Sequence, residues 1–198
     1  MPKDTFLNLP PTRQKEIEQL LLEIFYNRPV SQVKVTEIVE RMEMSRGAFY
    51  KYFEDLNDAY HYTLAQNAKI IRHDILRCID DNQEDFFVGI EHYLAKCGQL
   101  KPNTRYWRRI NLLTRSNSEL AVREISPGNT TAFVDRVIEV IRKNQFNIRD
   151  DNEMISFLYF ILEIIIDSLT AMVVNHWDSD QLLTDFRYKR KWLVGNLG

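Results

Sequence analysis

Residues 36–60 read TEIVERMEMSRGAFYKYFEDLNDAY, and this stretch decides the fold. Glu43-Met44 makes a tight connection in its middle, and Ser45 is placed to cap a helix that carries residues 46–53. Before that connection, apolar residues recur at the three- and four-residue spacing of a short helix. They are Val35, Ile38, Val39 and Met42. Two short helices around a turn of about three to four residues define a helix-turn-helix.

The second helix of such a motif enters the major groove of DNA, so its outer side chains must reach phosphates and base edges. At helical spacing Phe49 and Phe53 share one face, which we expect to point inward. The opposite face then carries Arg46, Tyr50 and Lys51 together with Gly47, a residue that lets the backbone approach DNA closely. The tyrosine hydroxyls of Tyr50 and Tyr52 can donate hydrogen bonds to phosphates.

The flanking sequence predicts an all-α protein of about nine helices. The chain has 198 residues but only 6 Gly and 6 Pro, too few breakers for many short strands. Residues 1–11 are predicted to form an irregular arm. Thr12 is the predicted N-cap of a first helix, which ends at Asn27-Arg28-Pro29. Asp55 is the predicted cap of a long helix that reaches about Asp80. Further helices are expected near residues 83–97, 103–115, 130–145, 151–177 and 180–195, with a segment from about 118 and a break at residues 126–128. We expect a domain at residues 1–55 and a larger one at residues 56–198.

Charge and composition narrow the class of protein. The formal net charge is -2, and residues 1–60 hold eight Lys/Arg against ten Asp/Glu, so any contact with nucleic acid depends on local placement. Residues 157–174 are apolar enough to suggest a membrane span, but Glu163 and Asp167 in their middle each cost about 2.5 to 3.5 kcal/mol on insertion. Cys78 and Cys97 form no CxxC pair and no leader precedes them, so a soluble protein of the reducing cytoplasm is expected.

The sequence of residues 36–60 resembles the DNA-binding signature of the TetR family, in which a turn of small residues leads into a recognition helix ending Tyr-x-x-Phe, here Tyr50 to Phe53. Residues 6–10 also resemble the lead-in of a branch of that family, so the resemblance covers roughly residues 5–65. It implies a three-helix DNA-binding head, a variable helical C-terminal domain that binds a small inducer, and a homodimer built on the last two long helices. The candidate DNA contacts are Lys34, Thr36, Ser45, Arg46, Gly47, Ala48, Tyr50, Lys51 and Tyr52.

Three positions depart from the family pattern. Glu43 stands where the turn usually has Gly, Lys34 replaces a Thr or Ser cap, and Leu56 stands where a Lys commonly touches phosphate. Each lost phosphate contact reduces the salt slope of binding by about 0.9, so Leu56 predicts weaker DNA binding with unchanged base preference. Lys3, Arg13 and Lys15 could steer the N-terminal arm to DNA, but ordinary surface charge is the preferred interpretation.

The closing helices indicate a homodimer. Between Ile155 and Trp177 apolar groups surround the helix, which requires more than one neighbour, and a partner subunit can supply the extra surface through residues 151–177 and 180–195. Two recognition helices about 34 Å apart then match successive major grooves. The alternative is a central helix of a monomeric bundle.

A polar stripe through the same helix suggests a ligand site for a cationic or polar inducer, because buried acids need a partner. The alternative is that the stripe faces solvent or pairs with Arg105, Arg108 or Arg109. Aromatic residues elsewhere in the chain could line a pocket, but aromatics at helical spacing are more often core. The stripe consists of Ser156, Tyr159, Glu163, Asp167 and Thr170, and the aromatics are Phe86, Phe87, Tyr93, Tyr106 and Trp107. The candidate ligand residues are Tyr106, Trp107, Tyr159, Glu163 and Asp167.

No catalytic or metal motif is present: the sequence has no HExxH, no GxSxG, no phosphate-binding Gly loop and no paired cysteine ligands. We therefore expect a regulator without enzymatic activity, cofactor or metal, which reads a palindromic operator as a dimer and is released by a small molecule. The main alternative is a helical protein-interaction module with a vestigial DNA-binding head. The third hypothesis is a helical enzyme that modifies small molecules, but no pair of nucleophile and base can be named for it.

Overall fold

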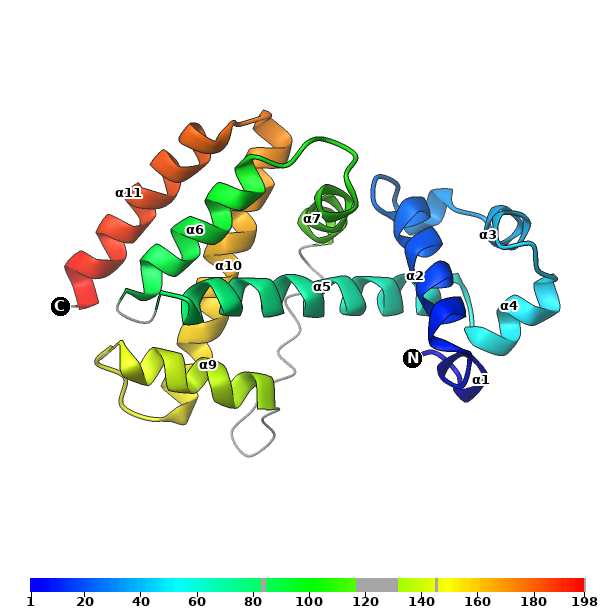
Figure 1. Cartoon of the computed structure of the whole chain (residues 1–198), viewed down its shortest axis with the longest axis horizontal. Coiled ribbons are helices and arrows are strands. Elements are labelled where there is room, and N and C mark those ends of the chain that lie inside the picture. Colours follow the sequence, from blue (N-terminus) through cyan, green and yellow to red (C-terminus); the bar gives the residue numbers. More distant parts are fainter. Residues whose placement is uncertain (83–84, 117–131, 145, 198) are drawn as a thin grey trace. The chain divides into compact units, whose positions relative to one another are not determined.

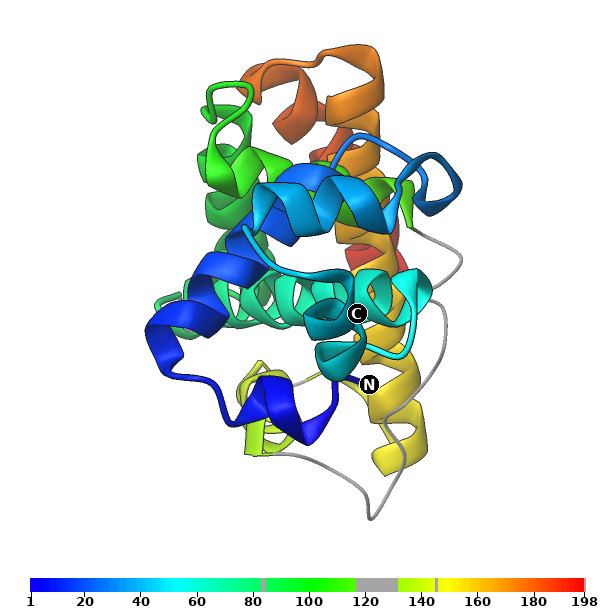
Figure 2. The ribbon, with the colours of Figure 1, turned by 90° about the vertical axis from the view of Figure 1, so that its right-hand side faces the viewer.

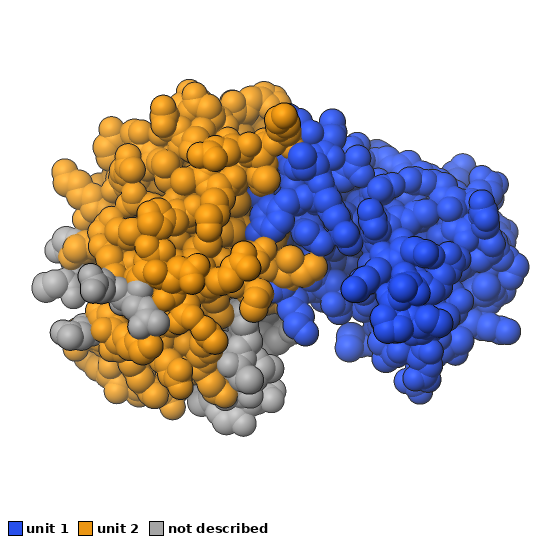
Figure 3. All heavy atoms as spheres, viewed as in Figure 1, with its two compact units in different colours: residues 1–69, 102–113 blue, residues 70–101, 114–198 orange. Residues whose placement is uncertain are grey.

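The computed structural model describes residues 1–82, 85–116, 132–144 and 146–197. Every regular element in these ranges is helical (Figure 1), so the predicted all-α class is confirmed. The chain forms two compact units (Figure 3): residues 1–69 with 102–113, and residues 70–101 with 114–198. The expected domain boundary after residue 55 lies at the start of a long helix, whereas the compact units divide inside that helix, after residue 69. The boundary between the DNA-binding domain and the C-terminal domain therefore stays a prediction.

The first unit contains the helix-turn-helix. Its helices are α1 (Asp4–Leu7), α2 (Pro11–Phe25), α3 (Val35–Arg41) and α4 (Arg46–Tyr52), with a 3-10 turn, η1 (Val30–Gln32), before α3. The predicted pair of short helices at residues 35–42 and 46–53 is confirmed. Helices this short are marginal alone, so burial of apolar side chains stabilises them. The fully buried side chains of these helices include Phe6, Ile17, Leu21, Ile24, Ile38 and Phe49.

Two expectations for the N-terminal residues were wrong. Residues 1–11 are not an irregular arm, since α1 forms within them and its Phe6 is fully buried. Thr12 is not the N-cap of α2, because the cap is Pro10, two residues earlier, and the helix starts at Pro11. Proline fits that position well, since it has no N–H to leave unsatisfied there and its φ is already helical.

The long helix α5 (Leu56–Asp80) has the predicted length and cap (Figure 1). The Asp55 carboxylate accepts a hydrogen bond from the Asp58 N–H at 2.8 Å, which confirms the predicted cap. The predicted apolar face of the helix is buried throughout, from Tyr60 to Ile79. Residues 102–113, which include most of α7 (Arg105–Arg115), belong to the same unit as the helix-turn-helix.

The second unit is a bundle of α6 (Phe86–Gly98), α9 (Ala132–Lys143), α10 (Asp151–Asn175) and α11 (Ser179–Leu197). Helix α6 packs against α10 and α11 in this bundle. A Cβ added to Gly89 of α6 would lie 2.5 Å from the Ile79 backbone, so glycine permits close packing of α6 on the end of α5. The expected segment from residue 118 and the break at residues 126–128 lie outside the described residues. The aromatic rings of Phe86, Phe87, Phe146 and Phe157 form a cluster with centroids 5.0 to 6.1 Å apart.

Candidate nucleic-acid interface

The turn between α3 and α4 has a defined hydrogen-bond pattern. The Met44 N–H donates to the Val39 carbonyl at 3.0 Å and the Glu43 N–H to the Glu40 carbonyl at 3.2 Å, the two bonds of a Schellman end. Glu43 takes the left-handed conformation there, with φ 52°. This conformation explains why glycine is the usual residue at this position of the turn.

Arg13 of α2 supports the turn from the side. Its Nη2 atom donates to the Met42 carbonyl at 3.0 Å, and its Nη1 atom pairs with Glu16 at 2.9 Å. A helix end leaves carbonyl groups without partners, and a cation there is also favoured by the helix dipole. Arg13 is therefore a structural residue of the helix-turn-helix, although the sequence predicted ordinary surface charge at this position.

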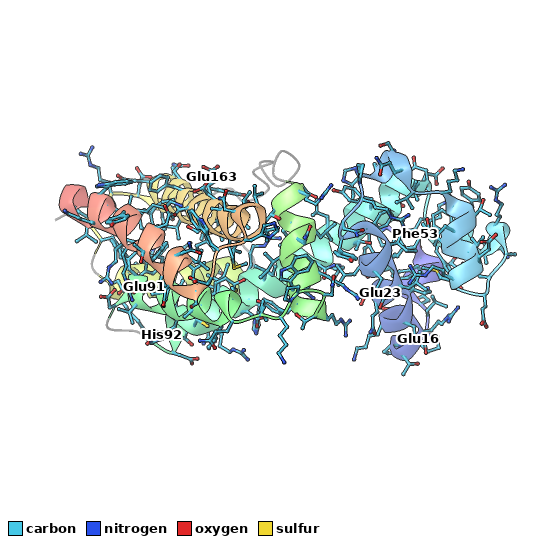
Figure 4. The ribbon with its side chains drawn as sticks, turned by 90° about the horizontal axis from the view of Figure 1, so that it is seen from above. Glu16, Glu23, Phe53, Glu91, His92 and Glu163 are labelled. Atoms are coloured by element: carbon cyan, nitrogen blue, oxygen red, sulfur yellow. The ribbon has the colours of Figure 1, made fainter. Side chains whose placement is uncertain are left out.

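The recognition helix α4 begins with the predicted cap. Ser45 Oγ accepts a hydrogen bond from the Ala48 N–H at 3.1 Å, which confirms the cap. Phe49 and Phe53 are fully buried, as predicted, and their rings lie 5.7 Å apart. Figure 2 turns this motif toward the viewer, and Figure 4 labels Phe53 within the first unit. Because the two rings fix the inward face, the rotation of α4 about its axis is fixed too.

The outward face of α4 is exposed. Arg46, Gly47, Tyr50 and Lys51 are all exposed, and 47% of Tyr50 is accessible. A Cβ added to Gly47 would meet only Ser45 Oγ, at 3.8 Å, so packing within the chain does not require glycine there. The open space at Gly47 suits close approach by another molecule.

The remaining candidate DNA contacts lie around this face. Lys34 is exposed and precedes α3 without a side-chain cap bond, while Thr36 and Ala48 are half-buried. Thr36 Oγ1 accepts a hydrogen bond from Arg46 Nη2 at 2.8 Å. Tyr52 is half-buried with its ring edge against Phe6, centroids 5.9 Å apart, so packing accounts for part of its role.

The N-terminal residues hold the far end of α4. The Lys3 N–H donates to the Tyr52 carbonyl at 2.8 Å, and Lys3 Nζ donates to the Tyr50 carbonyl at 3.0 Å and pairs with Glu54 at 2.7 Å. Phe6 packs on the Phe53 ring with centroids 5.1 Å apart. The sequence analysis did not predict this role of Lys3. The apolar residues Phe6 and Leu7 were the available sign that the N-terminal segment packs on the protein.

Ion pairs join α3 to the rest of the first unit. Arg28 donates to both carboxylate oxygens of Glu37, at 2.6 and 3.2 Å, and these hydrogen bonds lower the pKa of Glu37. Glu23, labelled in Figure 4, accepts from Arg41 of α3 at 2.9 Å and pairs with Arg108 of α7 at 3.3 Å. The position of α3 therefore depends on both α2 and α7.

The candidate ligand residues divide between the units. Tyr106 and Trp107 are half-buried on α7 in the first unit, and Trp107 packs edge-on against Tyr26 with centroids 6.2 Å apart. In the second unit Tyr159 is buried, whereas Glu163 and Asp167 are exposed.

The polar stripe of α10 faces solvent for the most part. Asp167 pairs with Lys189 of α11 at 2.6 Å. Glu163, which is labelled in Figure 4, is exposed. Arg108 pairs instead with Glu23 at 3.3 Å, and Arg109 donates to Asn67 at 3.1 Å. The acids are therefore not buried as the ligand argument assumed, because α10 has fewer neighbours on that side than its composition suggested. Their assignment to a ligand site stays a prediction.

Comparison with known families identifies the C-terminal part of the chain. Residues 85–194, more than half of the chain, match the family model described as "Tetracyclin repressor-like, C-terminal domain". The chain belongs to the TetR family. As a TetR-family protein it is a DNA-binding transcriptional regulator, and members of this family are generally not enzymes.

A TetR family transcriptional regulator from Chloroflexus aurantiacus J-10-FL, of known crystal structure, is 18% identical over 95% of this chain and 88% of its own, with a TM-score of 0.49. No curated protein matches the chain.

Proposed function

We propose that this TetR-family regulator is a cytoplasmic homodimeric repressor that binds a palindromic operator and is released by a small-molecule ligand. The observation that supports operator binding most directly is the outer face of α4. There two buried rings fix the helix rotation, and Arg46, Tyr50 and Lys51 are all exposed. Donor groups on a fixed helix face are what base readout in the major groove requires.

Fluorescence anisotropy on a labelled duplex from the promoter beside the protein's own gene tests operator binding. We expect tight, salt-sensitive binding that Arg46→Ala combined with Tyr50→Ala abolishes. Arg77→Ala is the matched control, because Arg77 is an exposed arginine of the second unit and loses the same charge. Binding no tighter than to a random duplex, unchanged by the α4 variants, would contradict recognition of this promoter.

The homodimer is proposed to form through α10 and α11. Exposed apolar side chains are Phe160 and Val174 on α10, and Tyr188, Trp192 and Val194 on α11. Trp192 keeps 65% of its surface accessible in the single chain. Large exposed apolar groups on neighbouring helices mark a surface that another molecule covers. The isologous pairing of two such surfaces would place two heads on one operator.

Helix α10 is also long and apolar enough, by length and composition alone, to cross a membrane. Its central residues Glu163 and Asp167 argue against insertion, because each acid is costly in the bilayer. Burial at a subunit interface accounts for the apolar length without a membrane.

Analytical ultracentrifugation tests this interface. Trp192→Glu combined with Phe160→Glu should give a monomer, because both charges would be buried without partners. Lys191→Glu, at an exposed neighbouring position, is the control and should leave the dimer intact. A dimer that survives the double substitution would place the interface elsewhere.

Ligand release is proposed to act through α5, which is one continuous helix with residues in both compact units. A ligand in the C-terminal domain needs only about 1.4 kcal/mol of preference for the non-binding form to weaken operator binding tenfold. Thermal-shift screening with small molecules, followed by anisotropy, identifies such a ligand. A compound that raises the melting temperature but leaves operator affinity unchanged would not be the inducer.

A further inference from the structure

Arg46 and Thr36 join the two helices of the helix-turn-helix by a hydrogen bond. Arg46 is the first residue of α4 and Thr36 the second of α3, and Nη2 of the arginine donates to Oγ1 of the threonine at 2.8 Å. An exposed arginine loses considerable rotamer freedom when it binds a partner. Because Thr36 already holds this side chain, part of that loss is taken on folding instead of on DNA binding.

The guanidinium retains enough donors for a directional contact. Arginine has five N–H groups and no acceptor, and Thr36 accepts from one of them. Two adjacent acceptors are therefore the best partner for the rest. In the major groove guanine presents such a pair, N7 and O6, whereas adenine presents an acceptor beside a donor. Side chains at the N-terminal end of a recognition helix are the ones that contact base edges.

We propose that Arg46 reads a guanine in each operator half-site and that Thr36 is its positioning residue. The inference rests on the proposed operator binding and adds the base that is read and the residue that sets its selectivity. A phosphate also offers two oxygens to a guanidinium, but it carries no sequence information, so only a base contact predicts selectivity among duplexes. The hydrogen bond to Thr36 orients the plane of the guanidinium, and orientation matters for a two-point contact with a base.

The test uses a duplex that the wild-type protein selects from a random-sequence library. At one guanine in each half-site, replacing G·C by A·T should weaken wild-type binding by about 5- to 150-fold. Replacing that guanine by 7-deazaguanine, which removes only the N7 acceptor, should weaken it by a smaller factor. Arg46→Ala should bind all three duplexes with the same affinity. Arg77→Ala, an exposed arginine of the second unit, is the matched control and should keep the base preference.

Variants of Thr36 test the positioning role. Thr36→Val keeps the branched shape but removes the acceptor, and should reduce the discrimination between the guanine and 7-deazaguanine duplexes. Thr36→Ser keeps the hydroxyl and should retain this discrimination between the two duplexes. Unchanged melting temperatures of the variants would show that they fold. A loss by Thr36→Val that is equal on every duplex would overturn the positioning role and indicate a phosphate contact.

The outcomes separate this inference from the function on which it rests. Salt-sensitive binding to a selected duplex, with no guanine at which Arg46→Ala removes discrimination, would overturn the guanine contact and leave operator binding intact. Failure of the wild-type protein to select any duplex would overturn both.

Discussion

Glu43 holds the strained position of the helix-turn-helix, and replacing it with glycine should stabilise the protein. Its φ of 52° is left-handed, which costs a side chain about 1 to 2 kcal/mol, whereas glycine adopts it freely. Glycine also makes the unfolded chain more flexible, which takes back about 0.4 to 1 kcal/mol. The difference leaves a gain of about 1 kcal/mol, or about 2 to 4 °C in melting temperature for a chain of this length.

Thermal unfolding followed by circular dichroism, at one protein concentration, measures this gain. Glu40→Gly is the matched control, because Glu40 is exposed but lies in α3, where glycine should cost about 0.5 to 1 kcal/mol. Glu43→Gln removes the charge and keeps the strain, so it should change stability by less than about 0.5 kcal/mol. If Glu43→Gly lowered the melting temperature as Glu40→Gly does, the strain argument would be refuted.

Three further predictions concern packing and ionisation. Phe6→Ala should destabilise the protein by about 3 to 5 kcal/mol, and Leu7→Ala far less, because the first side chain is fully buried and the second is 52% exposed; equal chemical-denaturation midpoints would contradict this. The hydrogen bonds from Arg28 lower the pKa of Glu37 below its ordinary value of 4.5, so their contribution to stability is present above that pH and is lost as the pH falls through the lowered pKa. Glu37→Gln should therefore flatten the acid limb of melting temperature against pH, and an unchanged limb would argue against the pair. Burial raises the pKa of Cys97 to about 12, so a thiol reagent should label this cysteine only after unfolding, and rapid labelling of the native protein would show that it is accessible.

The sequence alone determined α3, α4 and α5, and the caps of the last two of these helices. The apolar spacing around Ile38 and along α5 specifies helices because the hydrogen bonds of a helix join residues four apart. The caps at Ser45 and Asp55 are local in the same way, since each side chain accepts an N–H three residues on. Phe49 and Phe53 could be assigned to the inner face for the same reason, which left the candidate DNA contacts on the outer one.

Only the tertiary structure decided what holds the recognition helix and what covers α10. Lys3 reaches the Tyr50 carbonyl across 47 residues of sequence, and Arg13 reaches Met42 across 29, so no local pattern distinguishes them from surface charge. The hydrogen bond of Arg46 to Thr36 depends on how closely the turn brings two helices together. On α10 periodicity shows which residues share a face, but the neighbours of that face decide its burial, because burial depends on long-range packing.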